Sequence, residues 1–204
     1  MQIMEGKDKD IGVTKYLKVI LLGEYGVGKT SIFLRYIKDY FNPENTSTIR
    51  NNYITKELIR DNTTYRLRIW DTTGQEKYHS VTKLFIKDAN IVILVYSIDQ
   101  KSSLTNLNYW YKTTTDLCGD KIVIAIVANK YDLFDKIKEG LVEDEEGEKY
   151  ANKINGIFKT ISAKDDKKGV DSLFDMLLDE YIKRYNESED ENNLRINTKK
   201  KKER

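Results

Sequence analysis

Cysteine and proline are almost absent from this chain, whose 204 residues include one of each. A single cysteine cannot close an internal disulfide or build a Cys-rich zinc site, so we expect a reducing compartment. One proline and eleven glycines exclude collagen-like and proline-rich architectures. An excess of one charge is also missing, since 35 Lys and Arg against 33 Asp and Glu leave a net charge of +2. A dedicated nucleic-acid-binding protein would show a clear basic excess, so we expect no nucleic-acid partner.

Long hydrophobic runs are missing as well. The longest, such as Ile122 to Ala128, fall far short of the roughly 20 residues that a membrane-spanning helix needs. The first eight residues are too polar for a signal peptide, and Gln2 stands where N-myristoylation requires glycine. We therefore expect a soluble, cytoplasmic protein of one domain, with room for a short arm or tail.

Short apolar runs rich in β-branched residues alternate with segments of helical periodicity. Continuous apolar runs are typical of strands buried on both faces of a parallel sheet. The predicted strands of this kind are Val19–Leu22, Ile91–Tyr96, Ile122–Ala128 and Ile157–Ile161. Apolar residues at three- and four-residue spacing predict helices over 31–38, 104–117 and 171–181.

One pair of segments departs from this alternation. Residues 53–59 and 65–70 alternate apolar and polar side chains, and only residues 60–64 separate them. A link this short, with Asp61 and Asn62 at its centre, predicts an antiparallel hairpin. The predicted fold is therefore α/β, with a mixed, mostly parallel sheet and helices on both faces.

Composition changes near both ends of the chain. Residues 186–204 contain almost nothing apolar and include the basic run Lys199–Lys202, and the first dozen residues are similarly rich in polar and charged side chains. Such segments cannot bury enough surface to fold alone. We predict a flexible N-terminal arm over 1–14, a folded domain over 15–185 and a disordered, charged tail over 186–204.

The segment Gly23–Thr30 matches the pattern G-x-x-x-x-G-K-[ST] between a predicted strand and a predicted helix. Glycines let backbone N–H groups turn toward phosphate oxygens, and the helix N-terminus adds positive potential. Lys29 would reach the β- and γ-phosphates, and the Thr30 hydroxyl would bind Mg²⁺. The residues expected around the phosphates are Gly26, Val27, Gly28, Lys29, Thr30 and Ser31. The motif alone predicts a nucleoside triphosphate but neither its base nor its reaction, and a Gly-rich turn with a solvated lysine is the alternative.

A second motif begins where the second hairpin strand ends, at Asp71. A carboxylate at a strand end beside the P-loop can hold Mg²⁺, usually through its water shell. Gln75 then stands where a side-chain amide would orient an attacking water. An Asp followed by polar residues is often only the start of a loop, but its pairing with the P-loop favours the metal site.

Two further motifs follow two predicted strands. In Asn129-Lys130-Tyr131-Asp132, the carboxylate suits the adjacent N1–H and N2–H₂ donors of guanine, which adenine does not offer side by side. Ser162-Ala163-Lys164 would supply a backbone N–H to guanine O6. Each motif alone resembles an ordinary turn. Together, in order and at strand ends, they predict a guanine nucleotide.

The set resembles the Ras superfamily of small GTPases and, within it, the Rab family. The resemblance covers about Tyr16 to Tyr185 and implies a P-loop NTPase fold with a six-stranded sheet. Rab-like character lies in Tyr16-Leu17-Lys18, Ser47-Thr48-Ile49, Ile69-Trp70-Asp71 and the stretch 76–81.

The resemblance implies further roles. Thr48 in switch I would bind Mg²⁺ and the γ-phosphate, and Gly74 in switch II would donate its N–H to the same phosphate. Phe41 would contact guanine edge-on while Lys130 lies along its other face. Implied with them are slow GTP hydrolysis by a monomer and a role in vesicle trafficking. The implied partners are an exchange factor, a GTPase-activating protein and effectors, at the cytosolic face of an endomembrane.

Three features depart from the family pattern: two residues and the absence of a C-terminal cysteine. Tyr25 replaces a residue that is small in most relatives, and we hypothesise that it slows hydrolysis or restricts the activator; a ring turned to solvent without effect is the alternative. Arg50 replaces glycine and changes the charge of switch I. No cysteine for prenylation stands near the end of this sequence, so either the native tail is longer or the protein is not prenylated. The lysine run suits an anionic membrane or simply a solvated tail.

Two rival functions stay open. The first is a hydrolysis-deficient, GTP-bound docking module, which we consider because Tyr25 would lie near the γ-phosphate. The second is a P-loop phosphotransferase such as a nucleoside kinase, which has no need of Asn129–Asp132 or Ser162–Lys164.

Overall fold

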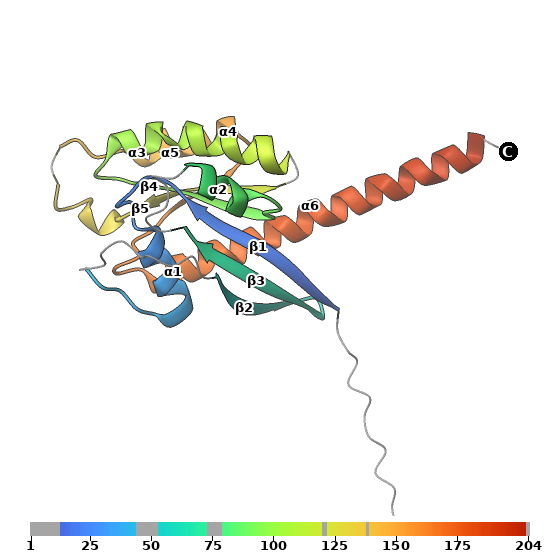
Figure 1. Ribbon diagram of the computed structural model, residues 1–204, viewed down its shortest axis with the longest axis horizontal. Helices are drawn as coiled ribbons and strands as arrows, with labels where there is room; N and C mark the ends of the chain where they lie inside the picture. Colours follow the sequence, from blue (N-terminus) through green and yellow to red (C-terminus); the bar gives the residue numbers. More distant parts are fainter. Residues whose placement is uncertain (1–12, 44–52, 73–78, 120–121, 138, 203–204) are drawn as a thin grey trace, which may run out of the picture.

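The structure is a computed structural model that describes residues 13–43, 53–72, 79–119, 122–137 and 139–202, with side chains omitted for 79–82 and 187–202. Six strands form one sheet in the order β2-β3-β1-β4-β5-β6 (Figure 1). They are β1 Thr14–Leu22, β2 Tyr53–Arg60, β3 Thr63–Asp71, β4 Ile91–Ser97, β5 Val123–Asn129 and β6 Ile157–Thr160. Neighbours run parallel except β2, which pairs antiparallel with β3. The predicted fold class is thus confirmed.

The β2–β3 hairpin has a tighter turn than the sequence predicted. Arg60 pairs with Thr63, so the link is the two residues Asp61 and Asn62 rather than five. Both have positive φ, 47° and 59°, as the favoured two-residue hairpin turn requires, and Asp and Asn tolerate this conformation well.

Helices cover both faces of the sheet. Their bounds are α1 Lys29–Lys38, α2 His79–Ile86, α3 Lys101–Thr105, α4 Leu107–Cys118, the 3₁₀ turn η1 Tyr131–Leu133, α5 Asp144–Lys153 and α6 Lys167–Lys202. Helices α1 and α6 pack on one face and α2 to α5 on the other. The single helix predicted over 104–117 was wrong: α3 and α4 meet at Asn106, where a shorter i→i+3 bond from Tyr109 N–H to Asn106 O interrupts the α-helical pattern.

Alternation along β1 divides the core in two. Leu17, Val19 and Leu21 face α1 and α6, while Ile20 and Leu22 face the other helices. Strands β4 and β5 are buried along their whole length, which explains why their sequences are continuously apolar. This rigid pair supports the loops at one edge of the sheet.

Helix α6 extends further than predicted. It continues to Lys202 through the segment predicted to be disordered, and Figure 1 shows this part projecting beyond the sheet. No Gly or Pro follows Gly169, and residues of good helix propensity such as Glu, Lys and Arg are frequent there, so the backbone has a local reason to stay helical. At the other end β1 begins at Thr14, and residues 1–12 of the predicted arm lie outside the described residues.

None of the described helices has the length and apolar character needed to span a bilayer.

Candidate nucleotide-binding site

Four sequence motifs meet at one edge of the sheet. The P-loop, Gly23–Thr30, follows β1; Asp71 ends β3; Asn129 ends β5; and Ser162 comes two residues after β6. These strands are parallel, so their carboxyl ends share that edge. Helix α1, which follows β1, packs on one face of the sheet, while α2 and α3, which follow the neighbouring strands β3 and β4, pack on the other. Such a switch point forms the crevice in which α/β proteins bind ligands.

Two glycines of the P-loop allow a close backbone path. Gly23 has φ 144°, and a Cβ there would lie 2.1 Å from Val95 O. Gly28 has φ 95°, and a Cβ there would lie 2.2 Å from Asn129 Nδ2. Helix α1 starts immediately afterwards, and no side chain among the described residues caps it. The backbone N–H groups in the first turn of a helix suit an anion, as predicted for phosphate at this position.

Lys29 spans the P-loop. Its side chain is buried, with 4% of the residue exposed, and its Nζ donates to Gly23 O at 2.9 Å and Glu24 O at 2.8 Å. These carbonyls keep the ammonium group within the loop. Arriving phosphates would thus meet a cation that is already positioned.

The two described residues predicted to bind Mg²⁺ come from adjacent segments. Asp71 is buried and lies beside Leu21 in the β1–β3 register, just before the P-loop. Thr30, in the first turn of α1, is half-buried. Thr72 fixes this junction by donating its hydroxyl to Leu21 O at 2.6 Å. A hydroxyl and a carboxylate are oxygen ligands of the kind Mg²⁺ takes, so these residues fit the ion.

Asn129 joins the P-loop to the loop 162–165, which we call the Ser162 loop. Its Nδ2 donates to Val27 O at 2.8 Å, and its Oδ1 accepts from Ala163 N–H at 3.1 Å. The residue is 1% exposed. One buried amide therefore fixes the phosphate loop relative to the loop expected to contact the base.

Asp132 faces the Ser162 loop. Its Oδ1 accepts from Ser162 Oγ at 2.9 Å, while the ammonium groups of Lys136 and Lys164 lie 3.5 and 3.9 Å from Oδ2. These neighbours orient an acceptor that would suit adjacent N–H donors of a base. Lys130 has φ 68°, and its Nζ lies 3.4 Å from an oxygen of Asp99.

Similarity to known proteins decides the family. The Ras family model matches residues 18–183. This chain belongs to the Ras family. Ras-related protein Rab-18 of Caenorhabditis elegans is 36% identical over 167 residues, 81% of this chain and 80% of that protein. Human Ras-related protein Rab-21 is 39% identical over 157 residues (77% and 68%), and GTP-binding protein ypt5 of Schizosaccharomyces pombe 40% over 153 residues (74% and 72%). Within the Ras family the chain is thus Rab-like, as its motifs predicted.

Some predicted residues of this Ras-family chain stay untested. Thr48, Gly74 and Gln75 lie outside the described residues, as does Arg50. Phe41 is half-buried in the segment after α1, and its contact with guanine stays a prediction. Tyr25 is 58% exposed.

One residue of the site was missed by sequence reasoning. Arg35, in the second turn of α1, donates from its guanidinium to Ala163 O and Lys164 O. An arginine within an amphipathic helix has the sequence pattern of an ordinary surface residue. Only the packing of α1 against the Ser162 loop reveals its contacts.

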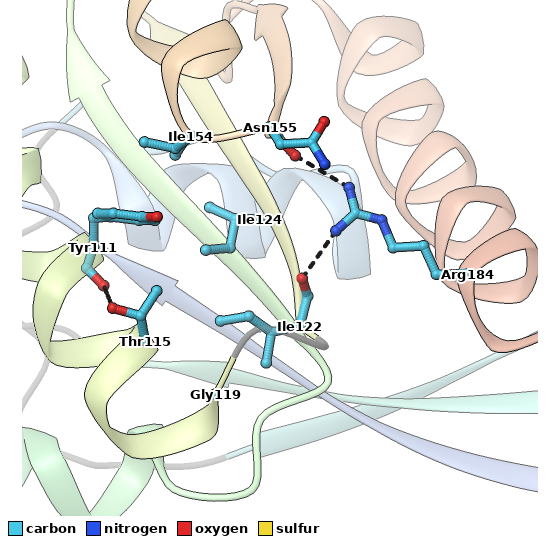
Figure 2. Close-up of a pocket in the computed structure, with 8 residues that line it drawn as sticks. All are labelled: Tyr111, Thr115, Gly119, Ile122, Ile124, Ile154, Asn155 and Arg184. Atoms are coloured by element: carbon cyan, nitrogen blue, oxygen red, sulfur yellow. Dashed lines mark hydrogen bonds between the residues drawn. The ribbon is translucent and has the colours of Figure 1, made fainter. Parts of the chain in front are cut away.

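The Ras-family domain has a second cavity at the opposite end of β5 (Figure 2). Its volume is about 200 Å³, and Ile122 and Ile124 form part of its apolar wall. Arg184 of α6 closes one side by donating to Ile122 O at 3.2 Å and Asn155 O at 3.1 Å. This arginine holds α6 against the end of the sheet that lies away from the P-loop.

Proposed function

We propose that this chain is a Mg²⁺-dependent molecular switch that binds GTP and hydrolyses it slowly to GDP and phosphate. The observation that carries the proposal is the single buried side chain of Asn129, which joins the P-loop to the Ser162 loop. A phosphate cradle alone suits any nucleoside triphosphate. A cradle tied to an oriented carboxylate, Asp132, suits guanine.

The reaction would be attack by water on the γ-phosphate. Lys29 and the backbone N–H groups at the start of α1 would stabilise the negative charge that spreads over the phosphate oxygens. Bound Mg²⁺ would neutralise charge on the β- and γ-phosphate oxygens, held by Thr30, Thr48 and Asp71. Gln75 would orient the water, as the family resemblance implies. An arginine from an activating protein would supply further stabilisation.

The cellular role follows from the Rab relatives. We propose that the chain regulates vesicle or membrane trafficking from the cytosolic face of an endomembrane. An exchange factor, an activating protein and effectors would contact it through the two switch segments, and membrane attachment of such a switch would need a lipidated tail.

The first experiment is single-turnover hydrolysis of GTP preloaded with Mg²⁺, without an activator. We expect a rate on the order of 10⁻⁴ s⁻¹, the slow intrinsic scale of such switches. Preloading also reports retention of the nucleotide. A chain that retains ATP as well as GTP would contradict the guanine switch and favour the kinase.

Base selection has its own test at Asp132. Asparagine at this position would present an N–H donor, which suits the C2 carbonyl of xanthine and not the C2 amine of guanine. We expect Asp132→Asn to weaken GDP binding by about two orders of magnitude, since a charged hydrogen-bond pair is lost, and to improve binding of xanthosine diphosphate. Competition against a fluorescent nucleotide measures both. An unchanged preference for GDP would show that Asp132 does not contact the base.

The rival docking module is tested at Tyr25. Because its ring is 58% exposed, Tyr25→Gly should leave the folded body intact while clearing space near the γ-phosphate. We favour the switch, since Lys29, Thr30 and Asp71 are all present at the phosphate end. If GTP is held tightly and no phosphate appears until Tyr25 is replaced, the docking module is the better description. Equal rates in both proteins, with and without an activator, would refute any role for this ring.

A further inference from the structure

We propose that Arg35 is a positioning residue for recognition of the base, acting through the backbone of the Ser162 loop. Its side chain is 15% exposed and comes from α1, the helix that follows the P-loop. The inference rests on the proposed binding of a guanine nucleotide. Arg35 lies in the helix that follows the phosphate loop, and it would act on the part of the site that binds the base.

The contacts of Arg35 are specific to two consecutive peptide groups. Its Nε donates to Ala163 O at 2.8 Å, and one terminal nitrogen donates to Lys164 O. The other terminal nitrogen donates to a carboxylate oxygen of Asp39 at 2.8 Å. This third contact helps to hold the guanidinium group in place. A planar fork with fixed donors orients two carbonyls more strictly than a single point charge does.

These carbonyls determine where the backbone N–H groups of the loop point. A trans peptide directs its C=O and N–H in opposite directions, and the described chain contains no cis peptide. The C=O of Ala163 belongs to the same peptide group as the N–H of Lys164. A hydrogen bond from Arg35 to that C=O therefore turns the N–H to the other side, and the positive charge polarises it into a stronger donor.

Two N–H groups of this loop, those of Ser162 and Lys164, have no acceptor among the described residues, and only the second belongs to a peptide group that Arg35 holds. The N–H of Ala163 donates to Asn129 Oδ1, and the N–H of Asp165 donates to Ser162 Oγ. Between them, the N–H of Lys164 has no acceptor among the described residues. It is thus the group that would donate to the O6 atom of guanine, and Arg35 fixes its direction.

The chain provides a chemically matched control at the other end of the sheet. Arg184 also donates to two backbone carbonyls, those of Ile122 and Asn155 (Figure 2). It donates as well to a carboxylate on its own helix, Glu180, four residues away. Removing either guanidinium removes the same kinds of bond. Only Arg35 touches the proposed base loop, so any general loss of packing appears in both variants.

The experiment compares Arg35→Met and Arg184→Met in the full chain, with GDP and 6-thio-GDP as ligands. The thio analogue retains the donors that face Asp132 and replaces O6 by a weak sulfur acceptor. We expect Arg35→Met to weaken GDP about tenfold, the scale of one misplaced hydrogen bond, and to weaken 6-thio-GDP much less. Arg184→Met should alter neither affinity more than twofold. Arg35→Lys should recover part of the loss, because an ammonium group reaches one carbonyl but not both.

Two results would overturn the proposal. One is an Arg35→Met protein whose GDP and 6-thio-GDP affinities fall by the same factor, which indicates general damage. The other is an Arg35→Met protein that binds GDP as the unaltered chain does. Failure of the unaltered chain to bind GDP at all would instead remove the proposed function on which this inference rests.

Discussion

Asn129 is the residue through which the two halves of the nucleotide site meet. Its amide donates to Val27 O and accepts from Ala163 N–H while almost fully buried. When a buried amide loses one partner, the fold is destabilised by the lost hydrogen bond and also by the burial of a polar group that no longer has a partner. A change that displaces this side chain should therefore disturb the phosphate loop and the base loop together.

Gly28 tests this dependence. In Gly28→Ala the new Cβ would lie 2.2 Å from Asn129 Nδ2, and the backbone would keep φ 95°, a conformation that costs an alanine about 1–2 kcal/mol. Displacement of Asn129 adds about 1–3 kcal/mol for unmet hydrogen bonds. We expect the free energy of unfolding in urea to fall by the sum of the two, about 2–5 kcal/mol, and GDP binding to be lost.

Gly26 provides the control for that substitution. It also has a positive φ, 80°, but a Cβ there would meet nothing within 4 Å. Gly26→Ala should thus incur only the conformational cost, about 1–2 kcal/mol. Equal losses in the two alanine variants would show that the contact between Gly28 and Asn129 is not the cause.

The Tyr150 side chain gives the chain a response to alkaline pH. Burial, followed by the charge on Tyr111, raises the pKa of Tyr150 to about 12 from an ordinary value near 10. Between these values the unfolded chain has lost the proton that the folded chain keeps, so the free energy of unfolding falls as pH rises. Below pH 10 both states are protonated and this dependence vanishes.

Tyr150→Phe is expected to reduce that slope by the share of Tyr150, while Tyr36 and Tyr96, whose pKa values burial also raises, keep theirs. The Tyr150 hydroxyl is buried and has no hydrogen-bond partner within the part of the chain that the structure describes. Its removal should leave stability at pH 7 unchanged or slightly higher, because no bond is lost and a desolvated group disappears. Urea unfolding at pH 7 and at pH 11 measures both. A variant that is less stable than the original at pH 7 would mean that the hydroxyl has a partner after all.

At the scale of elements, three aspartates connect α6 to the edge strand β2. Asp171, Asp175 and Asp179 recur every four residues and so lie along one side of the helix. Arg60 pairs with Asp175 at 2.6 Å and Asp179 at 2.8 Å, and Lys56 lies 3.9 Å from Asp171. Hydrogen bonds that Arg60 donates to the carboxylates of Asp179 and Asp175 raise the pKa of its guanidinium. Strand β2 is thereby held to the helix as well as to β3.

Replacing Asp175 and Asp179 by asparagine should loosen that attachment. The carboxylates are 48% and 59% exposed, so each pair is worth only about 0.2–1 kcal/mol and is screened by salt. We expect a stability loss below about 2 kcal/mol in 50 mM salt that shrinks in 500 mM salt, with faster amide exchange in β2. Glu146→Gln, which breaks a surface pair with Lys101, is the control. A loss that does not depend on salt would contradict an electrostatic attachment.

The same elements show how far the sequence leads and where it stops. Strands β4 and β5 were predictable because a run such as Val123–Asn129 is buried on both faces and has no reason to alternate. The P-loop and Asp132 were predictable because their chemistry depends on residue type and local spacing. The break at Asn106 and the role of Arg35 were not, since each depends on hydrogen bonds formed only after the chain is packed. Helix α2 was also missed, because its eight residues are too few for a helical period to be read from the sequence.

At the scale of the whole molecule, α6 belongs to the folded body over only part of its length. Its apolar side packs on the sheet through residues such as Phe174, whose ring stacks on Tyr36 with centroids 3.6 Å apart. Further along, Arg184 binds the carbonyls of Ile122 and Asn155, and Lys15 lies 4.1 Å above the ring of Tyr185. Beyond this point Figure 1 shows the helix projecting away from the sheet.

Two truncations separate these parts. A chain ending at Asn186 retains Arg184 and Tyr185, so we expect its free energy of unfolding to change by less than about 0.5 kcal/mol and its GDP affinity to stay the same. A chain ending at Ile182 loses both anchors and leaves the carbonyls of Ile122 and Asn155 without their charged donor, which should cost about 2–4 kcal/mol. Urea unfolding and nucleotide competition measure both chains. If the cut after Asn186 is as damaging as the cut after Ile182, the projecting segment contributes to the folded body, and the predicted domain boundary at residue 185 is wrong.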